Sequence, residues 1–504
     1  MTTGLGGEAV ETASPTGDVP VATGHPAPTD RGLVVGLATG FASLGMLLWW
    51  VLQSPFVGLA DNGDWGRYSC PLGLSGKVRF TTVPATLARE HCLAYDYRST
   101  FTPFLWAFAK VDTFTSGSVH LSHLALFWSV VVSIGWGWFA FELYRVTGKA
   151  VRSSLATATL VVVSSDVIFT SYFGSIYAEA LVIALAPSLA AALLRMVRCS
   201  PVDLPTLLGT SALVVVVTCA KPSMAFTAPL FVGVVVIAKR GSLDGMRVAM
   251  AAIAALGLAL FSLTAIADPT LTSWNTYNLA FTVVLPESGD AQGTLVDMGI
   301  DPVDARGLRR FVGVEFGPSV TDAWDDPPLV AFRRAGRSKV VEAVALHPRI
   351  WAHMMQRGGS TMGDLRLEYL ANHTGPADAT TPRLAERPHP ADAVLDGVAA
   401  VWWLLPLAWV VLAGWFASQL RRGSPDPRVQ ALRALGLFAV AFGALQTATA
   451  LGDGYYELAK HLVIAGEVTA LSVVGLLVAG LWALVERRRA PSQVSDPVGP
   501  ALPR

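Results

Sequence analysis

The residues best suited to chemistry lie in one short stretch, residues 61–67 (DNGDWGR), a few positions after the first long apolar run ends. Its Asn-Gly pair favours a turn that holds both carboxylates close together. A carboxylate can take a proton from an acceptor hydroxyl, and Arg67 can bind a phosphate. The competing interpretation is a polar turn that caps a helix. Because two acids and an arginine follow a predicted membrane helix, we favour Asp61 and Asp64 as catalytic residues.

The composition indicates a membrane protein, because 52% of the residues are hydrophobic and only 15% are charged. The apolar runs are long enough to cross a bilayer, which takes about 20 helical residues. They predict an all-α polytopic fold with about ten membrane helices. The predicted spans are Gly32–Pro55, Leu121–Tyr144, Ser153–Tyr172, Tyr177–Met196, Leu204–Ala220, Met224–Ala238, Val248–Ala267, Val394–Ser418, Ala431–Leu451 and His461–Val485.

The distribution of basic residues predicts the orientation of these spans. The short segments at one end contain most of the Lys and Arg, whereas the short turns at the other end contain only Lys221 and Lys460. Short cytoplasmic loops retain such an excess of positive charge. We therefore expect both termini in the cytoplasm and the two long segments, 56–120 and 268–393, outside it.

This topology divides the chain into consecutive parts. Residues 1–30 lack an apolar run and are expected to form a disordered cytoplasmic tail. Residues 31–267 form the first part of the membrane core, which includes the long outer loop. Residues 268–393 form a small, mainly helical outer region, with a helix predicted over Pro328–Met355. Residues 394–486 return to the membrane, and residues 487–504 form a second cytoplasmic tail.

Other polar residues collect at the predicted outer end of the helices. Glu457 and His461 are spaced i,i+4 beside Lys460, so one helical surface carries a polar stripe. A charge at a helix end often extends to the lipid headgroups, which for a single lysine is as good an explanation as function. For Asp166 we favour a buried structural pairing. The candidates for binding substrate or phosphate are Arg67, Tyr177, Glu179, Lys221, Glu457, Lys460 and His461.

Two cysteines lie in the first outer loop and predict a disulfide. Cys70 and Cys92 share that loop, whereas Cys199 and Cys219 fall elsewhere and are expected to be free thiols. No Cys/His spacing typical of a metal site is evident. The metal-binding assignment therefore stays open, with Asp61 and Asp64 as the ligands of any divalent cation.

Acids and bases at the outer rim of a helical bundle suit one kind of transfer. A sugar carried on a lipid phosphate has its anomeric carbon just above the hydrocarbon. Transfer needs a carboxylate to deprotonate the acceptor and cations to neutralise the leaving phosphate. Asp61 or Asp64 would be the base, and Arg67, Lys221 and Lys460 would be the phosphate partners. A divalent cation is possible but not required, because three cations are present.

The order of these motifs resembles a known family. An acidic motif after the first span is similar to the GT-C superfamily, whose members use polyprenyl-phosphate-linked sugars. Within it, the chain looks like bacterial glycan-biosynthesis hexose transferases of the WsfD type, over about residues 32–486. The motifs that carry this likeness are residues 61–64, the turn from Ser171 to Glu179, Leu295 to Pro302, and residues 457–461. The resemblance implies that Asp61 or Asp64 is catalytic.

The expected function is therefore transfer of a hexose from a polyprenyl-phosphate donor to a cell-envelope glycan or lipid acceptor. It would take place at the outer face of a bacterial plasma membrane, with the bilayer as a partner and without nucleic acid. Two alternatives remain. A flippase for lipid-linked glycans should carry mid-membrane charges or an internal repeat, and neither is clear. A non-catalytic envelope-assembly protein would not need paired acids at its outer rim.

Overall fold

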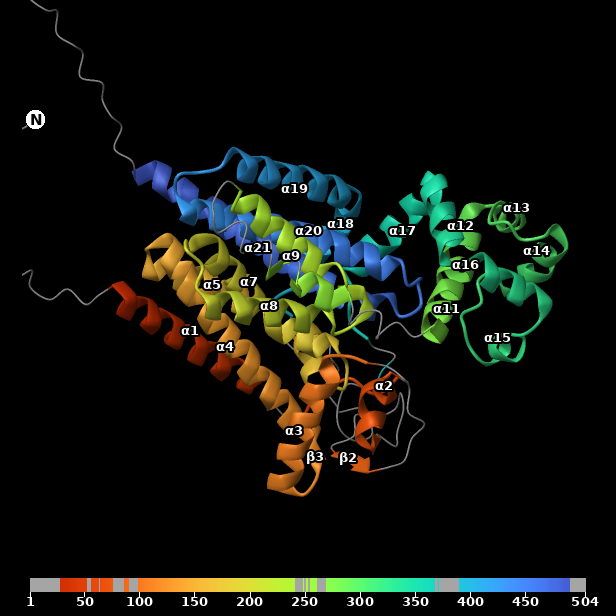
Figure 1. Ribbon diagram of the computed structural model, residues 1–504, viewed down its shortest axis with the longest axis horizontal. Helices are drawn as coiled ribbons and strands as arrows, with labels where there is room; N and C mark the ends of the chain where they lie inside the picture. The colour runs from red at the N-terminus through yellow and green to blue at the C-terminus, as the bar shows by residue number, and fades with distance from the viewer. Residues whose placement is uncertain are drawn as a thin grey trace, which may run out of the picture.

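The computed structural model describes residues 28–51, 56–62, 64–75, 86–89, 98–240, 248, 251–252, 254–260, 269–367, 370 and 389–489. Nearly all of its regular elements are helices (Figure 1). The longer apolar helices are α1 (Pro28–Val51), α4 (Leu121–Thr147), α5 (Ala150–Ser164), α7 (Glu179–Arg198), α8 (Leu204–Thr218), α9 (Thr227–Ala238), α19 (Leu405–Arg422), α20 (Pro427–Leu451) and α21 (Leu458–Arg489).

The predicted class is confirmed: the protein is an all-α, multi-pass membrane protein. Among the described residues, six helices are long and apolar enough to cross a bilayer, and a bent pair gives a seventh. Two shorter apolar helices, Leu204–Thr218 and Pro222–Ala238, also match predicted spans. The predicted span 248–267 is only partly described, so the total of ten remains a prediction. The terminal tails fall largely outside the described residues.

The bent pair shows why one predicted span is interrupted. The span predicted over Ser153–Tyr172 ends as a straight helix at Ser164, and the chain turns by 62° into α6 (Val167–Thr170) and η2 (Ser171–Gly174). Asp166 caps α6 by accepting the Ile168 amide at 2.9 Å, and its other oxygen accepts the Ala391 amide at 2.8 Å. We expected this fully buried carboxylate to pair with Glu179 or a lysine, but its partners are these two amides and His389, whose Nδ1 lies 3.5 Å from Oδ1.

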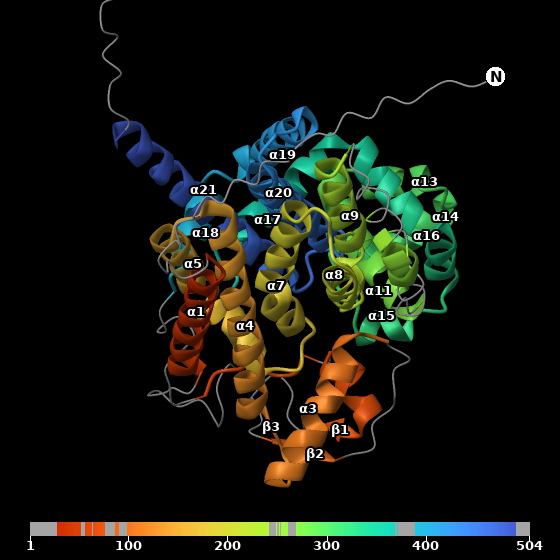
Figure 2. The ribbon, with the colours of Figure 1, turned by 60° about the vertical axis from the view of Figure 1, so that its left-hand side comes forward.

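Close packing of α1 on α4 depends on glycine, and α4 and α7 lie at the centre of the bundle (Figure 2). Gly32, Gly36 and Gly40 repeat every fourth residue along α1. A Cβ on Gly36 would meet the Gly137 carbonyl oxygen of α4 at 2.9 Å. Small residues at such spacing let membrane helices approach closely. The two helices can therefore pack closely because these three positions of α1 have no side chain.

We expect Gly36→Ile to lower the free energy of unfolding by about 1–3 kcal/mol, because the added side chain forces α1 away from α4. Thermal unfolding of the purified protein in detergent measures this. Gly45→Ile is the matched control, since a Cβ there meets nothing within 4 Å. Equal unfolding temperatures for the two variants would contradict the packing argument.

The segment after α1 forms a small unit that projects from the bundle (Figure 2). It contains α2 (Trp65–Ser69), η1 (Cys70–Leu72), α3 (Phe101–Ser116) and three short antiparallel strands in the order β1-β2-β3. The strands are β1 (Leu74–Ser75), β2 (Thr86–Arg89) and β3 (Val119–His120). Tyr68 of α2 packs edge-on against Phe101 of α3, with ring centroids 5.1 Å apart. This contact ties the loop after the first span to the start of α3.

A second helical unit lies between α9 and α19 in the chain and at the right of Figure 1. It comprises α11 (Pro269–Asn278), η4 (Leu279–Val284), α12 (Leu285–Ser288), α13 (Ala291–Asp297), α14 (Pro302–Leu308), η5 (Arg309–Phe311), α15 (Pro318–Asp322), α16 (Pro327–Leu346) and α17 (Pro348–Thr361). The single helix predicted over Pro328–Met355 is wrong. The chain leaves helical geometry twice in this range: at Gly336 (φ +76°), where α16 is kinked, and at His347, after which Pro348 starts α17. α18 (Asp392–Ala400), η3 (Pro222–Met224) and η7 (Trp402–Leu404) complete the described elements.

Candidate active site

The loop that carries the acidic motif is ordered by a hydrogen bond of its own and by a ring contact to Tyr177. The Asp61 side chain is 5% exposed and accepts the Trp65 amide at 3.1 Å, which starts α2. Trp65 is buried and meets Tyr177 edge-on, with ring centroids 6.2 Å apart. The capping role that we weighed against function is therefore present for Asp61. A cap and a catalytic carboxylate are compatible, because a carboxylate has several acceptor positions.

Tyr177 holds this loop from the other side. Its hydroxyl donates to the Ala60 carbonyl oxygen at 2.6 Å, and it accepts the Asn62 amide at 3.2 Å. Tyr177 belongs to the turn that precedes α7, which lies more than one hundred residues further along the chain. The substrate-binding role that the sequence predicts for Tyr177 stays a prediction; in the structure its hydroxyl is hydrogen-bonded to the acidic loop. The Tyr177 hydroxyl thus holds the backbone on both sides of Asp61.

Four charged side chains join the loop to the start of α21. Lys460 Nζ donates to Asp64 Oδ2, and it lies 3.0 Å from Glu457 Oε2. Arg67 Nη2 lies 2.9 Å from the other oxygen of Asp64. The Lys460 side chain is 2% exposed and also lies over the Tyr177 ring, 4.8 Å from its centroid. A lysine this deeply buried is stable only when it is paired.

A second ion pair adjoins the first. Lys221 Nζ lies 2.6 Å from Glu179 Oε1, and both side chains are largely buried. Lys460 also interacts electrostatically with Glu179. We call the six residues of these pairs the ionic site; they are Asp64, Arg67, Glu179, Lys221, Glu457 and Lys460. The ionic site unites four segments that are far apart in sequence.

The charges of Arg67 and Lys460 govern the protonation of Asp64. Burial by itself would raise the pKa of this carboxyl, but Lys460 and Arg67 outweigh it and hold the pKa well below its usual range. Asp64 is therefore ionised at neutral pH. A carboxylate with such low proton affinity is a poor general base and a good partner for cations.

The backbone that presents Glu457 is unusual. Glu457 has φ +52°, and among the described residues it is the only non-glycine with positive φ. That conformation costs free energy for a residue with a Cβ, and such residues gather at functional sites. The turn lets Glu457 face both Lys460 and the Asn62 side chain, whose amide donates to Glu457 Oε1. The preceding turn is held at Gly454, where a Cβ would meet the Asn278 backbone at 3.0 Å.

His461 lies next to the ionic site. It is partly buried and interacts electrostatically with Asp453, Lys221, Lys460 and Glu457. The structure thus brings together every candidate that the sequence places at the outer end of the helices. Two of them, Lys460 and Asp61, are nearly inaccessible to solvent.

The cysteines divide as the sequence predicts. Cys199 and Cys219 are free thiols, whereas Cys70 is disulfide-bonded. Cys92, the predicted partner of Cys70, lies outside the described residues. A disulfide at Cys70, the first residue of η1, would limit the movement of the segment that follows α2.

Two groups of polar residues that the structure brings together were not singled out from the sequence. Asn62 lies within the acidic motif but was considered only as a turn residue; its side chain joins the loop to Glu457. The other is a cluster of Asp112, His120 and His123, whose ligand atoms all lie within 4.8 Å of one another. No local spacing marks this cluster, because its residues come from three successive elements.

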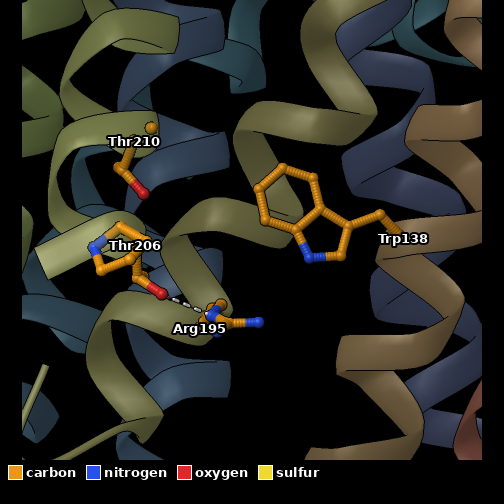
Figure 3. A pocket seen from close by; sticks show the side chains of 6 residues that line it. Trp138, Arg195, Thr206 and Thr210 are labelled. Carbon is orange, nitrogen blue, oxygen red and sulfur yellow. Dashed lines mark hydrogen bonds between the residues drawn. The ribbon is translucent and has the colours of Figure 1, made fainter. Parts of the chain in front are cut away.

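A cavity of about 260 Å³ lies elsewhere in the bundle, between α4, α7 and α8. Figure 3 shows Trp138 on one side of it and Arg195, Thr206 and Thr210 on the other. Arg195 donates to Thr206 at 2.8 Å. It lies 16 residues after Glu179 on the same helix, or about 24 Å away along its axis. The cavity is therefore remote from the ionic site.

The fold and the ionic site together define the protein as a multi-pass, all-α membrane protein with buried ion pairs at one end of its helix bundle. The family described as the YfdI N-terminal transmembrane domain matches residues 34–494. The chain belongs to this family. The match does not single out hexose transferases of the WsfD type.

Comparison with curated proteins finds no match. Among solved structures, the chain is similar to the archaeal oligosaccharyltransferase AglB from Archaeoglobus fulgidus, in complex with an inhibitory peptide and a dolichol-phosphate. The identity is 14% and the TM-score is 0.40, and the match covers 91% of this chain. The chain spans about half of AglB, since the match covers 52% of it. No functional conclusion follows from so distant a likeness.

Proposed function

We propose that the protein is a membrane glycosyltransferase of the GT-C type that transfers a sugar from a polyprenyl-phosphate donor to a cell-envelope glycan or lipid. The observation that carries the proposal is the partly buried ion-pair network of Asp64, Arg67, Glu457 and Lys460 beside Asp61. Ion pairs buried at a helix-bundle end are costly, and their desolvation is unexplained by stability alone. The sequence resemblance supplies the donor class and a hexose as the sugar.

We assign the base to Asp61. Asp64 is bound to two cations and has a depressed pKa, so it accepts protons poorly. In the proposed reaction Asp61 takes the acceptor hydroxyl proton, and the acceptor oxygen forms a bond to the anomeric carbon. The bond from that carbon to the phosphate oxygen breaks, and its electron pair leaves with the phosphate. Asp64 holds Arg67 and Lys460 in place.

The cations match the charge that develops during transfer. The donor phosphate diester carries one negative charge, and the released monoester carries close to two at neutral pH, since its second pKa is about 6. Arg67, whose side chain is 29% exposed, is the accessible cation, and Lys460 lies behind it. Donors placed before the reaction at the position of developing charge stabilise the transition state.

A divalent cation is not needed for this proposal. Lys460 Nζ already lies between the carboxylates of Asp64 and Glu457, where an ion would lie if these acids were its ligands. The chain itself thus supplies positive charge beside Asp64. Under the proposed topology, the ionic site faces away from the cytoplasm of a bacterium, because the basic short loops lie at the opposite helix ends.

The proposal is tested in membranes that contain the protein and a polyprenyl-phosphate hexose. We expect donor consumption, with release of polyprenyl phosphate, and its loss in the double variant Asp61→Asn, Asp64→Asn. Asp326→Asn is the control, because that residue pairs with Arg310 in an exposed contact elsewhere. A double variant that consumes donor like the wild type would refute the assignment to this loop.

A further inference from the structure

A second group of polar side chains lies outside the ionic site, at the corner where α3 ends and α4 begins. Asp112 belongs to α3, His120 ends β3, and His123 lies in the first turn of α4. Their side chains are 4%, 29% and 49% exposed, respectively. Asp112 lies 11 residues after Phe101, or about 16 Å further along α3. The ionic site, which adjoins the α2 end of this unit, is therefore separate.

The three ligand atoms are close to the arrangement of a metal site. His123 Nδ1 lies 2.7 Å from Asp112 Oδ1, and His120 Nδ1 lies 3.6 Å from Asp112 Oδ2. In a tetrahedral zinc site with bonds of about 2.0–2.1 Å, neighbouring ligand atoms are about 3.3 Å apart. The observed distances lie on either side of this value. Small side-chain rotations would therefore admit an ion between the three groups.

The surrounding hydrogen bonds orient these ligands. Asp112 accepts the Ser116 hydroxyl at 3.0 Å and the His120 backbone amide at 2.6 Å. The far nitrogen of His120, Nε2, lies 3.3 Å from the Ser118 hydroxyl, which leaves Nδ1 on the side of Asp112. Metal-binding His and carboxylate groups have outer partners of this kind, which fix the tautomer and the ring orientation.

We propose that Asp112, His120 and His123 bind one divalent transition-metal ion, with zinc as the best match. Two imidazoles and one carboxylate suit zinc, cobalt or nickel better than magnesium or calcium, which take oxygen ligands. The exposed side of His123 leaves room for water at the fourth position. The ion links the last turn of α3 to the first turn of α4, and with β3 it fixes the small sheet.

The helix dipole of α4 opposes a bound cation, but only by a small free energy. The N-terminus of α4 opposes a cation by about 0.3–1 kcal/mol. The Asp112 carboxylate offsets this, because the site carries one negative charge when both histidines are neutral. A second possible group, Asp166, His389 and Asp392, is a weaker candidate. Both Asp166 oxygens there already accept backbone amides.

The test is direct metal binding to the purified full-length protein after removal of bound metal. We expect one equivalent of Co²⁺ to bind with the visible spectrum of a tetrahedral site, to be displaced by Zn²⁺, and Zn²⁺ to raise the unfolding temperature. Binding weakens as the pH falls, because protons compete for the imidazoles. Absence of binding at neutral pH would overturn the proposal.

Variants separate metal binding from the hydrogen bonds already present. His123→Gln can still donate to Asp112 but is a poor ligand, so metal affinity should fall at least about tenfold while the metal-free protein unfolds as before. His353→Ala is the control, because His353 pairs with Glu287, at 2.5 Å, in the second helical unit. Equal metal affinity in His123→Gln and His353→Ala would show that the cluster is only a hydrogen-bonded staple.

Discussion

Asp61→Asn is expected to lower the rate of sugar transfer by about 10²- to 10⁴-fold, the usual loss when a general base is removed. An amide cannot take the acceptor proton. Its oxygen can still accept the Trp65 amide, which Asp61 now accepts at 3.1 Å, so α2 should form as before. The loss should therefore appear in kcat, with little change in KM. Initial rates over a range of donor concentrations, measured in proteoliposomes, give both constants.

The pH dependence of the remaining activity distinguishes the two acids. The cations Arg67 and Lys460 keep the pKa of Asp64 well below its usual range, although burial opposes them. Asp64 therefore stays ionised, and it cannot cause a fall in kcat between pH 4 and pH 7. Any acid limb in that range reports another group, and it should disappear in Asp61→Asn. An unchanged limb, or unchanged kcat, would exclude Asp61 as the base.

The membrane helices were predictable because each is a continuous apolar run. Their ends were less predictable, because they depend on local polar contacts. Predicted spans and helices agree closely at Leu121 and Leu451, where helix ends coincide with changes in polarity. They differ at Asp166, whose capping of α6 interrupts a run that hydropathy alone presents as one helix. A single carboxylate thus changed a span into a bent pair.

The candidate site was predictable in membership but not in pairing. Counting spans places Asp64, Glu179, Lys221 and Lys460 at the same end of the bundle. It does not reveal that Lys460 binds Asp64 and Glu457 while Lys221 binds Glu179. Those pairings depend on how the helices are arranged around one another and on the positive φ of Glu457. Neither property has a signature in a single sequence.

The cluster of Asp112, His120 and His123 shows the same limit more sharply. His120 and His123 lie at a helix start, where two histidines have no marked meaning. Asp112 lies close to them because the short connection through β3 brings the end of α3 next to the start of α4. The sequence separation of the three residues reflects only the length of the connection between α3 and α4. It matches no familiar Cys/His metal-binding pattern.

Lys460→Ala should reduce transfer by about 10²- to 10³-fold, the loss typical of removing one group that stabilises developing negative charge. It should also lower the free energy of unfolding by about 3–5 kcal/mol, because Glu457 and one side of Asp64 lose a buried partner. The two effects must be separated, since an unstable protein also transfers less sugar. Thermal unfolding and kcat measured on the same preparation quantify each.

The double variant Lys460→Gln, Glu457→Gln makes that separation. It removes one positive and one negative charge together, and the two amides can hydrogen-bond to each other, so most of the lost stability should return. Transfer should not return, because the released phosphate still lacks the Lys460 charge. The matched comparison is Glu457→Gln alone, which keeps Lys460 paired with Asp64 and should retain more activity than the double variant. If the double variant recovered both stability and kcat, Lys460 would be a structural residue, and phosphate stabilisation would fall to Arg67 and Lys221.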